Sequence, residues 1–249
     1  LFFLFKFEKN KKMKKLIVFT LALFASNLIN AQITIENKLY TVSYSEVYQQ
    51  PLFLNYSYPI SRSVWVEDFP IHWDILGEVT YPDVKCTGFS WKTPKGILTS
   101  DDKDYENNEY DKGHLVPSSF FNNYEENLNF LFSYLNCGLM HETLNRGVWQ
   151  QLEKYERSLY DEDLNVRVKV LLTFSPEGKI VDGGATVPTH FTKIIEYGFS
   201  DTYLYGSKIT FKREVYSFPN DATVKGKKID AFKIEKLSGE FTSTSLDLD

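Results

Sequence analysis

The sequence predicts an α+β fold with a mixed, mainly antiparallel sheet at its core. Alternating apolar and polar residues over Pro51–Tyr58 and Val166–Phe174 indicate two half-buried strands. Apolar residues near helical spacing over Leu144–Tyr160 indicate a helix. Aromatic residues make up 16% of the 249-residue chain and are mostly Tyr and Phe, which favour sheets.

The segments before the helix supply further expected elements. Ile33–Tyr44 alternates loosely and is predicted to be a strand. Thr99–Glu109 is a polar loop that leads into a short strand, which Pro117 ends or confines to the edge of a sheet. Asn122–Asn129 predicts a short helix or a turn, and the compact apolar run Phe130–Cys137 predicts a buried strand.

The segments after the helix extend the sheet. Ile180–Tyr197 is expected to continue it, Ile209–Phe218 to form another strand, and Ala231–Lys236 to form a strand or a short helix. Polar and acidic residues over Thr242–Asp249 indicate a fraying tail. The length and the lack of repeats or flexible linkers predict one domain.

The N-terminus has the pattern of an export signal. Met13 is the first methionine, so residues 1–12 are interpreted as an artefact of upstream translation. Two lysines, an apolar run from Leu16 to Ala25 and a final small residue predict a signal peptide over 13–31. The apolar run is too short to span a membrane comfortably. We therefore expect a single secreted or periplasmic domain over 32–249, free of the membrane after cleavage.

The charge of the chain argues against non-specific attraction to polyanions. The formal net charge is −5, and loss of residues 1–31, which hold six lysines and one glutamate, would lower it to −10. A nucleic-acid substrate would therefore need a local basic patch.

Two cysteines, Cys86 and Cys137, are present. A secreted chain meets an oxidising compartment, so a disulfide between them and two buried free thiols are both compatible with the sequence.

The first candidate for chemistry is Asp111-Lys112-Gly113-His114-Leu115-Val116-Pro117. Histidine takes up or releases a proton near neutral pH, so His114 is a candidate acid or base. Gly113 leaves room beside it, so we expect a bulky substrate backbone to approach closely there. Taken alone, the segment is more typical of a structural histidine in a turn than of a catalytic one.

The second candidate lies on the predicted helix. Asn145, Glu153 and Arg157 fall within an arc of roughly 120° at 3.6 residues per turn. An amide oxygen and a carboxylate on one face suit Mg²⁺, which keeps most of its water ligands. Arg157 suits a phosphate, or an ion pair with Glu153. An amphipathic helix with solvated charges has the same pattern.

The two segments together carry a more specific signal. Asp-Lys-Gly-His at 111–114, Asn136 and Leu-Asn-Arg-Gly-Val-Trp-Gln-Gln-Leu-Glu at 144–153 resemble the DNA/RNA non-specific endonuclease family. Its usual pattern is Asp-Arg-Gly-His, an Asn-containing strand end, and Asn-x-Gly-x-Trp-x-x-Leu-Glu. The resemblance spans most of the chain from Asp111 onward. It implies a ββα-metal, or His-Me finger, site and cleavage of DNA, RNA or both.

The resemblance also implies roles for individual residues. His114 is expected to be the general base, and Asn145 the sole direct protein ligand of Mg²⁺, with Mn²⁺ or another divalent cation as an alternative. Glu153 is expected to orient the water ligands of the metal, and Arg157 to lie near the scissile phosphate.

Three further residues, Lys112, Asn136 and Arg146, are expected to bind substrate. Lys112 stands where the family usually has arginine, so a bidentate phosphate ligand becomes a point charge. Met140 stands where many members have glutamine. These departures, with the acidic charge, leave open a secreted nucleic-acid-binding protein with little or no turnover. A surface adhesion or carbohydrate-binding sheet is a further alternative, but it leaves His114, Asn145 and Glu153 unexplained.

Overall fold

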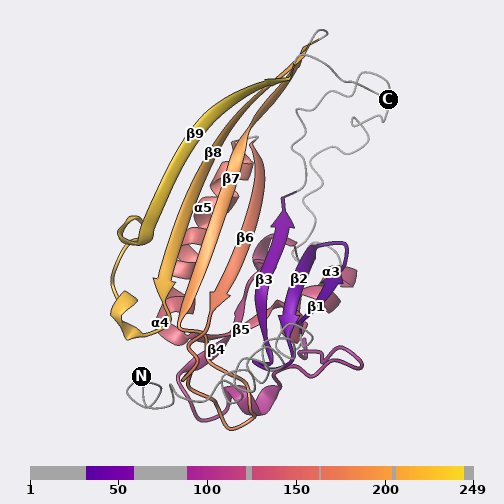
Figure 1. Ribbon diagram of the computed structural model, residues 1–249, viewed down its shortest axis with the longest axis vertical. Helices are drawn as coiled ribbons and strands as arrows, with labels where there is room; N and C mark the ends of the chain where they lie inside the picture. Colours follow the sequence, from indigo (N-terminus) through magenta and orange to yellow (C-terminus); the bar gives the residue numbers. More distant parts are fainter. Residues whose placement is uncertain (1–31, 59–88, 122–124, 163, 204–205, 244–249) are drawn as a thin grey trace, which may run out of the picture.

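Antiparallel strands form both sheets of the computed structural model, which describes residues 32–58, 89–121, 125–162, 164–203 and 206–243 (Figure 1). Within these ranges the main sheet has seven strands in the order β1-β2-β3-β6-β7-β8-β9, and β4 pairs with β5 in a second sheet. The main-sheet strands are β1 (Gln32–Glu36), β2 (Tyr40–Ser45), β3 (Gln50–Ser57), β6 (Asn165–Thr173), β7 (His190–Tyr203), β8 (Gly206–Pro219) and β9 (Lys233–Ser243). The predicted α+β class with a mainly antiparallel core is confirmed.

The N-terminal strands follow the sequence pattern with one correction. β3 matches the strand predicted over 51–58, and β6 matches the one over 166–174. The single strand predicted over Ile33–Tyr44 is wrong, because a turn divides it into β1 and β2. The Asn37 side chain accepts hydrogen bonds from the backbone N–H groups of Leu39 and Tyr40, at 2.9 and 3.1 Å. This local bond stabilises a turn that apolar periodicity does not reveal.

The strand predicted over Phe130–Cys137 is also wrong. The helix α3 (Glu125–Leu131) ends there, a 3-10 turn covers Tyr134–Asn136, and β5 (Cys137–His141) begins only at Cys137. Residues 131–140 are all buried. An apolar run that is buried on every side has no periodicity to separate strand from helix, so the sequence could not decide between them.

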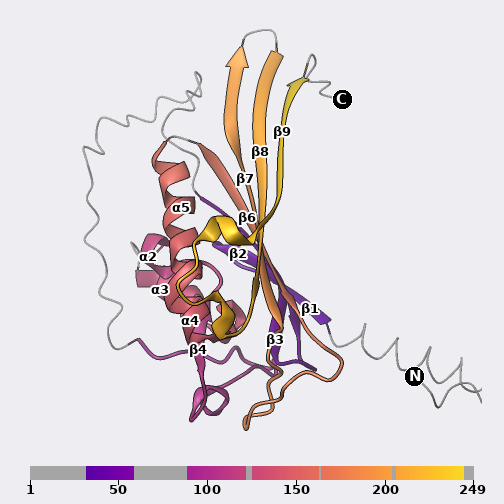
Figure 2. The ribbon, with the colours of Figure 1, turned by 90° about the vertical axis from the view of Figure 1, so that its left-hand side faces the viewer.

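Helices cover one face of the main sheet (Figure 2). The predicted helix over 144–160 is present but divided into α4 (Glu142–Leu144), a π-helical turn (Asn145–Trp149) and α5 (Gln150–Asp161). Gly147 leaves helical dihedral angles inside that turn. Leu152 and Leu159 of α5 are buried in one core with Val168 of β6. The turn changes the direction of Asn145 relative to α5, so the arc expected for one continuous helix does not apply.

The strands of the C-terminal half start and end at other residues than the sequence indicates. β7 starts at His190 and not at Ile180, because residues 180–189 form a loop held by Asp104, whose Oδ1 accepts from Ala185 N at 2.9 Å. β9 follows a 3-10 turn over Ile229–Phe232 and includes the start of the expected tail. The remaining short elements are the helix α2 (Ser118–Phe121) and 3-10 turns over Asp102–Tyr105 and Ala222–Val224.

Several expectations fall on residues outside the described ranges. These are the artefact over 1–12, the signal peptide over 13–31 and the pairing of Cys86 with Cys137, since Cys86 lies outside the described residues. Among the described residues, no helix is long and apolar enough to cross a membrane.

Candidate active site

His114 ends β4 (Tyr110–His114), directly opposite Cys137 of β5. Two aromatic side chains hold its imidazole: the ring centroid of Trp91 lies 4.8 Å away and that of Phe132 5.0 Å away. The backbone is fixed as well, since Trp149 Nε1 donates to the carbonyl oxygen of His114 at 3.1 Å. These contacts tie the end of β4 to the start of α5.

Burial lowers the pKa of His114 to about 4. The imidazole is therefore neutral at pH 7 and able to accept a proton. Its Nε2 is buried and has no hydrogen-bond partner among the described residues. Because His114 also lines a pocket, Nδ1 is the ring nitrogen that a water molecule in that pocket can reach.

Asp111 connects β4 to the π-helical turn. Its Oδ2 accepts from Asn145 Nδ2 at 3.0 Å and from Arg146 Nε at 2.9 Å, and its Oδ1 accepts from Arg146 Nη2 at 2.6 Å. Arg146 also pairs with Glu142 at 3.1 Å. The hydrogen bond from Asn145 Nδ2 to Asp111 sets the plane of the Asn145 amide. It leaves the carbonyl oxygen of that amide without a hydrogen bond to any described residue.

Glu153 and Arg157 lie one turn apart on α5. Burial raises the pKa of Glu153 to about 7, and the charges of Lys193 and Arg157, with a hydrogen bond from Trp149, oppose that rise. Arg157 donates from Nη2 to the hydroxyl oxygen of Ser119 at 2.7 Å. Within the described chain Arg157 forms no ion pair, so the pair with Glu153 that the spacing allowed is not formed.

One pocket of about 390 Å³ brings most of the predicted residues together. His114, Asn145, Arg146, Glu153 and Arg157 all line it, although they come from segments up to 43 positions apart. The lining also includes four residues that the sequence analysis missed: Ser118, Ser119, Gln150 and Lys154. Helical spacing from Arg146, Glu153 and Arg157 could have indicated Gln150 and Lys154, but nothing in the sequence distinguished the two serines.

Lys112 and Asn136 do not line this pocket. The Lys112 ammonium pairs with Asp102 and lies 5.7 Å from the centroid of the Tyr134 ring. Asn136 is fully buried, so it cannot contact substrate as expected. Its Oδ1 accepts from Val116 N at 2.8 Å, and its Nδ2 donates to the carbonyl oxygens of Val116 and Leu131. Asn136 therefore positions the chain after His114.

Gly113 and Met140 also differ from expectation. A Cβ at Gly113 would lie 2.6 Å from Met140 Cβ, so glycine makes room for a buried cross-strand neighbour and not for substrate. Met140 is fully buried beneath β4. The departure from glutamine at this position therefore removes no polar group from the pocket.

The pocket contains oxygen atoms that are suitable ligands for a largely hydrated divalent ion. The carbonyl oxygen of Asn145 and the carboxylate of Glu153 are hard oxygen ligands, and Asp111 orients the first of them. The described residues contain no group of three or more His, Cys, Asp or Glu side chains arranged to hold a metal. An ion here would therefore depend on Asn145 and on water.

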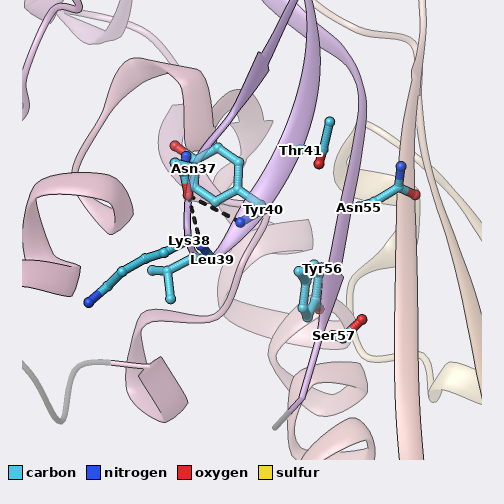
Figure 3. Close-up of a pocket in the computed structure, with 8 residues that line it drawn as sticks. All are labelled: Asn37, Lys38, Leu39, Tyr40, Thr41, Asn55, Tyr56 and Ser57. Atoms are coloured by element: carbon cyan, nitrogen blue, oxygen red, sulfur yellow. Dashed lines mark hydrogen bonds between the residues drawn. The ribbon is translucent and has the colours of Figure 1, made fainter.

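A second hollow, of about 290 Å³, lies between the β1–β2 turn and β3 (Figure 3). Asn37, Thr41, Asn55 and Ser57 are among the residues that line it. The Asn37 side chain is engaged in the backbone turn drawn there. This hollow contains no histidine or carboxylate, in contrast to the pocket at His114.

Comparisons with known proteins match the chain to a family and to solved structures. The family described as DNA/RNA non-specific endonuclease matches residues 20–246. A solved structure titled "Crystal structure of the EndoG/EndoGI complex: Mechanism of EndoG inhibition" is similar in fold, with a TM-score of 0.62 and 19% identity over 81% of this chain and 80% of that chain. No curated protein matches the chain.

Proposed function

Because this chain belongs to the DNA/RNA non-specific endonuclease family, whose members are metal-dependent nucleases, we propose that it cleaves DNA, RNA or both in the pocket at His114, with little sequence preference. The family makes the chain a phosphodiester hydrolase. The observation that carries the proposal is that a neutral histidine, an oriented amide, a carboxylate and an arginine line one pocket.

His114 is proposed as the general base. Its low pKa keeps it unprotonated at neutral pH, and the aromatic contacts fix its ring. Nδ1 would accept the proton of a water molecule that attacks the phosphorus, while the leaving oxygen departs on the opposite side. No covalent intermediate with the protein is required.

Asn145 is proposed as the protein ligand of a divalent cation, Mg²⁺ in the first instance, with Mn²⁺ or another ion as alternatives. Asp111 holds the amide nitrogen, which leaves the carbonyl oxygen for the ion. Glu153 would accept hydrogen bonds from the water ligands. When bound, the ion supplies Lewis-acid stabilisation of charge on the phosphoryl oxygens.

Arg157 is a better candidate than Arg146 for contact with phosphate. Arg157 has no carboxylate partner within the described residues, and Ser119 holds its guanidinium at the pocket. Arg146 is paired with Asp111 and Glu142, so contact with a phosphate would have to replace a carboxylate. We therefore propose that Arg146 mainly holds Asp111 in place, and that contact with substrate is its second role.

The alternative of a binding protein without turnover has less support than the sequence indicated. Lys112 lies in an ion pair outside the pocket lining, and Met140 is buried, so neither departure removes a group from the pocket.

A secreted or periplasmic location remains part of the proposal. It rests on the signal pattern over 13–31, and N-terminal sequencing of exported protein tests it, since a chain that starts before residue 32 contradicts it.

Plasmid nicking and RNA digestion with Mg²⁺, with and without a chelator, test the activity. We expect cleavage that the chelator abolishes. His114→Ala is expected to reduce kcat by about 10²–10⁴-fold with metal binding retained, because only the base is removed. His190→Ala, which changes an exposed histidine outside the pocket, is the matched control. No cleavage under any metal or salt condition, or an unchanged rate in His114→Ala, contradicts the proposal.

A further inference from the structure

Lys193 is a charged residue in a core position. Buried residues alternate along the start of β7, at Phe191, Lys193, Ile195 and Tyr197, and this row faces the helices. The Lys193 ammonium pairs with Glu156 of α5 at 2.6 Å, and both side chains are 0% exposed. A buried ion pair gains little net stability, because the loss of hydration offsets the attraction. The pair is therefore a candidate for a role other than stability.

Both carboxylate oxygens of Glu156 accept hydrogen bonds from described residues. Its Oε1 accepts from Lys193, and its Oε2 accepts from the hydroxyl groups of Tyr56 at 2.5 Å and Tyr58 at 3.3 Å. Burial raises the pKa of both tyrosines, so they remain protonated donors. The carboxylate thus holds the ammonium in a fixed place between β3, α5 and β7.

From this place the ammonium lies on the face of the Trp149 indole, 4.3 Å from the ring centroid. Such a contact is attractive, and the cation withdraws electron density from the ring and makes the indole N–H a stronger donor. That N–H donates to the carbonyl oxygen of His114 at 3.1 Å. Glu153 lies one helical turn after Trp149, and the indole lowers the pKa of its carboxyl group. Trp149 therefore touches both halves of the site.

We propose that Lys193 is a positioning residue of the nuclease site: its ammonium, held by Glu156, fixes the Trp149 indole, whose N–H holds the carbonyl oxygen of His114 one helical turn before Glu153. The proposal rests on the proposed function, because it assigns those two residues their roles. Lys193 itself lies behind Trp149 and is fully buried, so it does not contact the nucleic acid.

Lys193→Met tests the proposal by removing the charge at similar side-chain length. We expect kcat to fall by about 10–100-fold, as for other residues that orient catalytic groups, while KM for nucleic acid stays within about threefold. Lys169→Met is the matched control. Lys169 pairs with Glu196 on the same sheet, but its side chain is 42% exposed. An unchanged kcat in Lys193→Met, or an equal loss in Lys169→Met, overturns the proposal.

A double variant separates positioning from stability. Lys193→Met alone leaves the Glu156 carboxylate buried without its cation, and this lowers the melting temperature. Lys193→Met with Glu156→Leu replaces the pair by apolar side chains, so the melting temperature is expected to recover while kcat stays low. Recovery of both quantities shows that the pair serves stability only, and overturns the proposal.

Trp149→Phe gives an answer even if the Lys193 variants do not fold. It keeps an aromatic ring over the ammonium and removes the N–H, so we expect a loss of kcat similar to that of Lys193→Met; a parental kcat overturns the proposal. The parent chain, assayed with Mg²⁺ beside every variant, separates the two hypotheses. A parent that does not cleave contradicts the proposed function, whereas an active parent with active variants contradicts only the role of Lys193.

Discussion

Two ionisable side chains in one pocket have pKa values that burial shifts in opposite directions. Loss of hydration disfavours the charged form of each group, so it lowers the pKa of His114 to about 4 and raises that of Glu153 to about 7. The histidine is therefore already a base at neutral pH, while the carboxylate is only partly ionised. Because the proposed mechanism needs both groups unprotonated, Glu153 limits activity on the acid side.

This difference predicts the pH dependence. kcat/KM is expected to rise with pH through a midpoint near 7, where Glu153 ionises, because His114 stays neutral down to about pH 4. Higher Mg²⁺ should move the midpoint to lower pH, since a nearby cation favours the carboxylate. Rates measured from about pH 4 to 9 at two Mg²⁺ concentrations check this. A midpoint near 4 that ignores Mg²⁺ would identify His114 as the limiting group.

At the scale of elements, the two-stranded β4–β5 sheet and a helix meet at the site through a few polar bonds. Asp111 of β4 holds Asn145 and Arg146 of the π-helical turn, and Trp149 of that turn holds the carbonyl oxygen of His114. The two-stranded sheet thus positions His114, the proposed base, and the helix positions the amide of Asn145 and the carboxylate of Glu153. Each bond crosses between the two elements, so a shift of either element changes the separation of the catalytic groups.

Asn136 provides a test of how the end of β4 is held. Asn136→Ala is expected to destabilise the protein by about 2–4 kcal/mol, because it leaves buried backbone groups of Val116 and Leu131 without partners. Chemical denaturation measures this loss. KM per folded molecule should stay close to the parental value, because Asn136 lies outside the pocket lining. A large rise in KM with little loss of stability would restore a direct role in substrate binding.

Gly113 tests the packing of the β4–β5 sheet. Gly113→Ala is expected to cost about 1–3 kcal/mol, because the new methyl group would meet Met140 Cβ at 2.6 Å across β4 and β5. Activity should fall too, since displacement of β4 moves His114. Adding Met140→Gly removes the atoms in conflict and is expected to recover part of the stability. Thermal melting of the single and double variants measures both effects; full stability in Gly113→Ala contradicts the packing argument.

At the scale of the whole molecule, an acidic chain carries a local set of cations at the pocket. The net charge is −5, yet Arg146, Lys154 and Arg157 all line the site. Arg146 is neutralised by carboxylates, while Lys154 and Arg157 form no ion pair within the part of the chain that is described. Binding of a polyanion therefore depends on a small region of α5, and we expect few counterions to be released on binding.

Lys154 tests this local electrostatic binding. Lys154→Ala is expected to reduce the slope of log KM against log salt concentration by about one unit, because one phosphate contact is lost. kcat should change little, since Lys154 has no part in proton transfer. Lys169→Ala, which removes a lysine from the sheet outside the pocket lining, is the control and should leave the slope unchanged. An unchanged slope in Lys154→Ala would exclude a phosphate contact at this residue.

The sequence by itself determined the fold class, the strands β3 and β6 and the helix after Asn145. It also predicted His114, Asn145, Glu153 and Arg157 as site residues, and the structure places all four around one pocket. These features can be read from short stretches of sequence. Side chains alternate between the two faces of a strand or recur on one face of a helix, and the two motifs lie in the short segments 111–117 and 144–153. Where burial removes the period, as over residues 130–137, or a side chain forms a turn, as at Asn37, the same reasoning fails.

Only the tertiary structure decided which polar residues reach the pocket. Asn136 and Lys112 belong to the motif but turn away from the pocket, whereas Lys154 and Ser119 have no motif and line it. The structure also revealed the ion pair between Lys193 and Glu156 beneath Trp149. Which side chains reach the pocket depends on packing between segments far apart in the chain. A buried polar group without a partner costs free energy, so each buried polar side chain lies beside a hydrogen-bonding or charged partner.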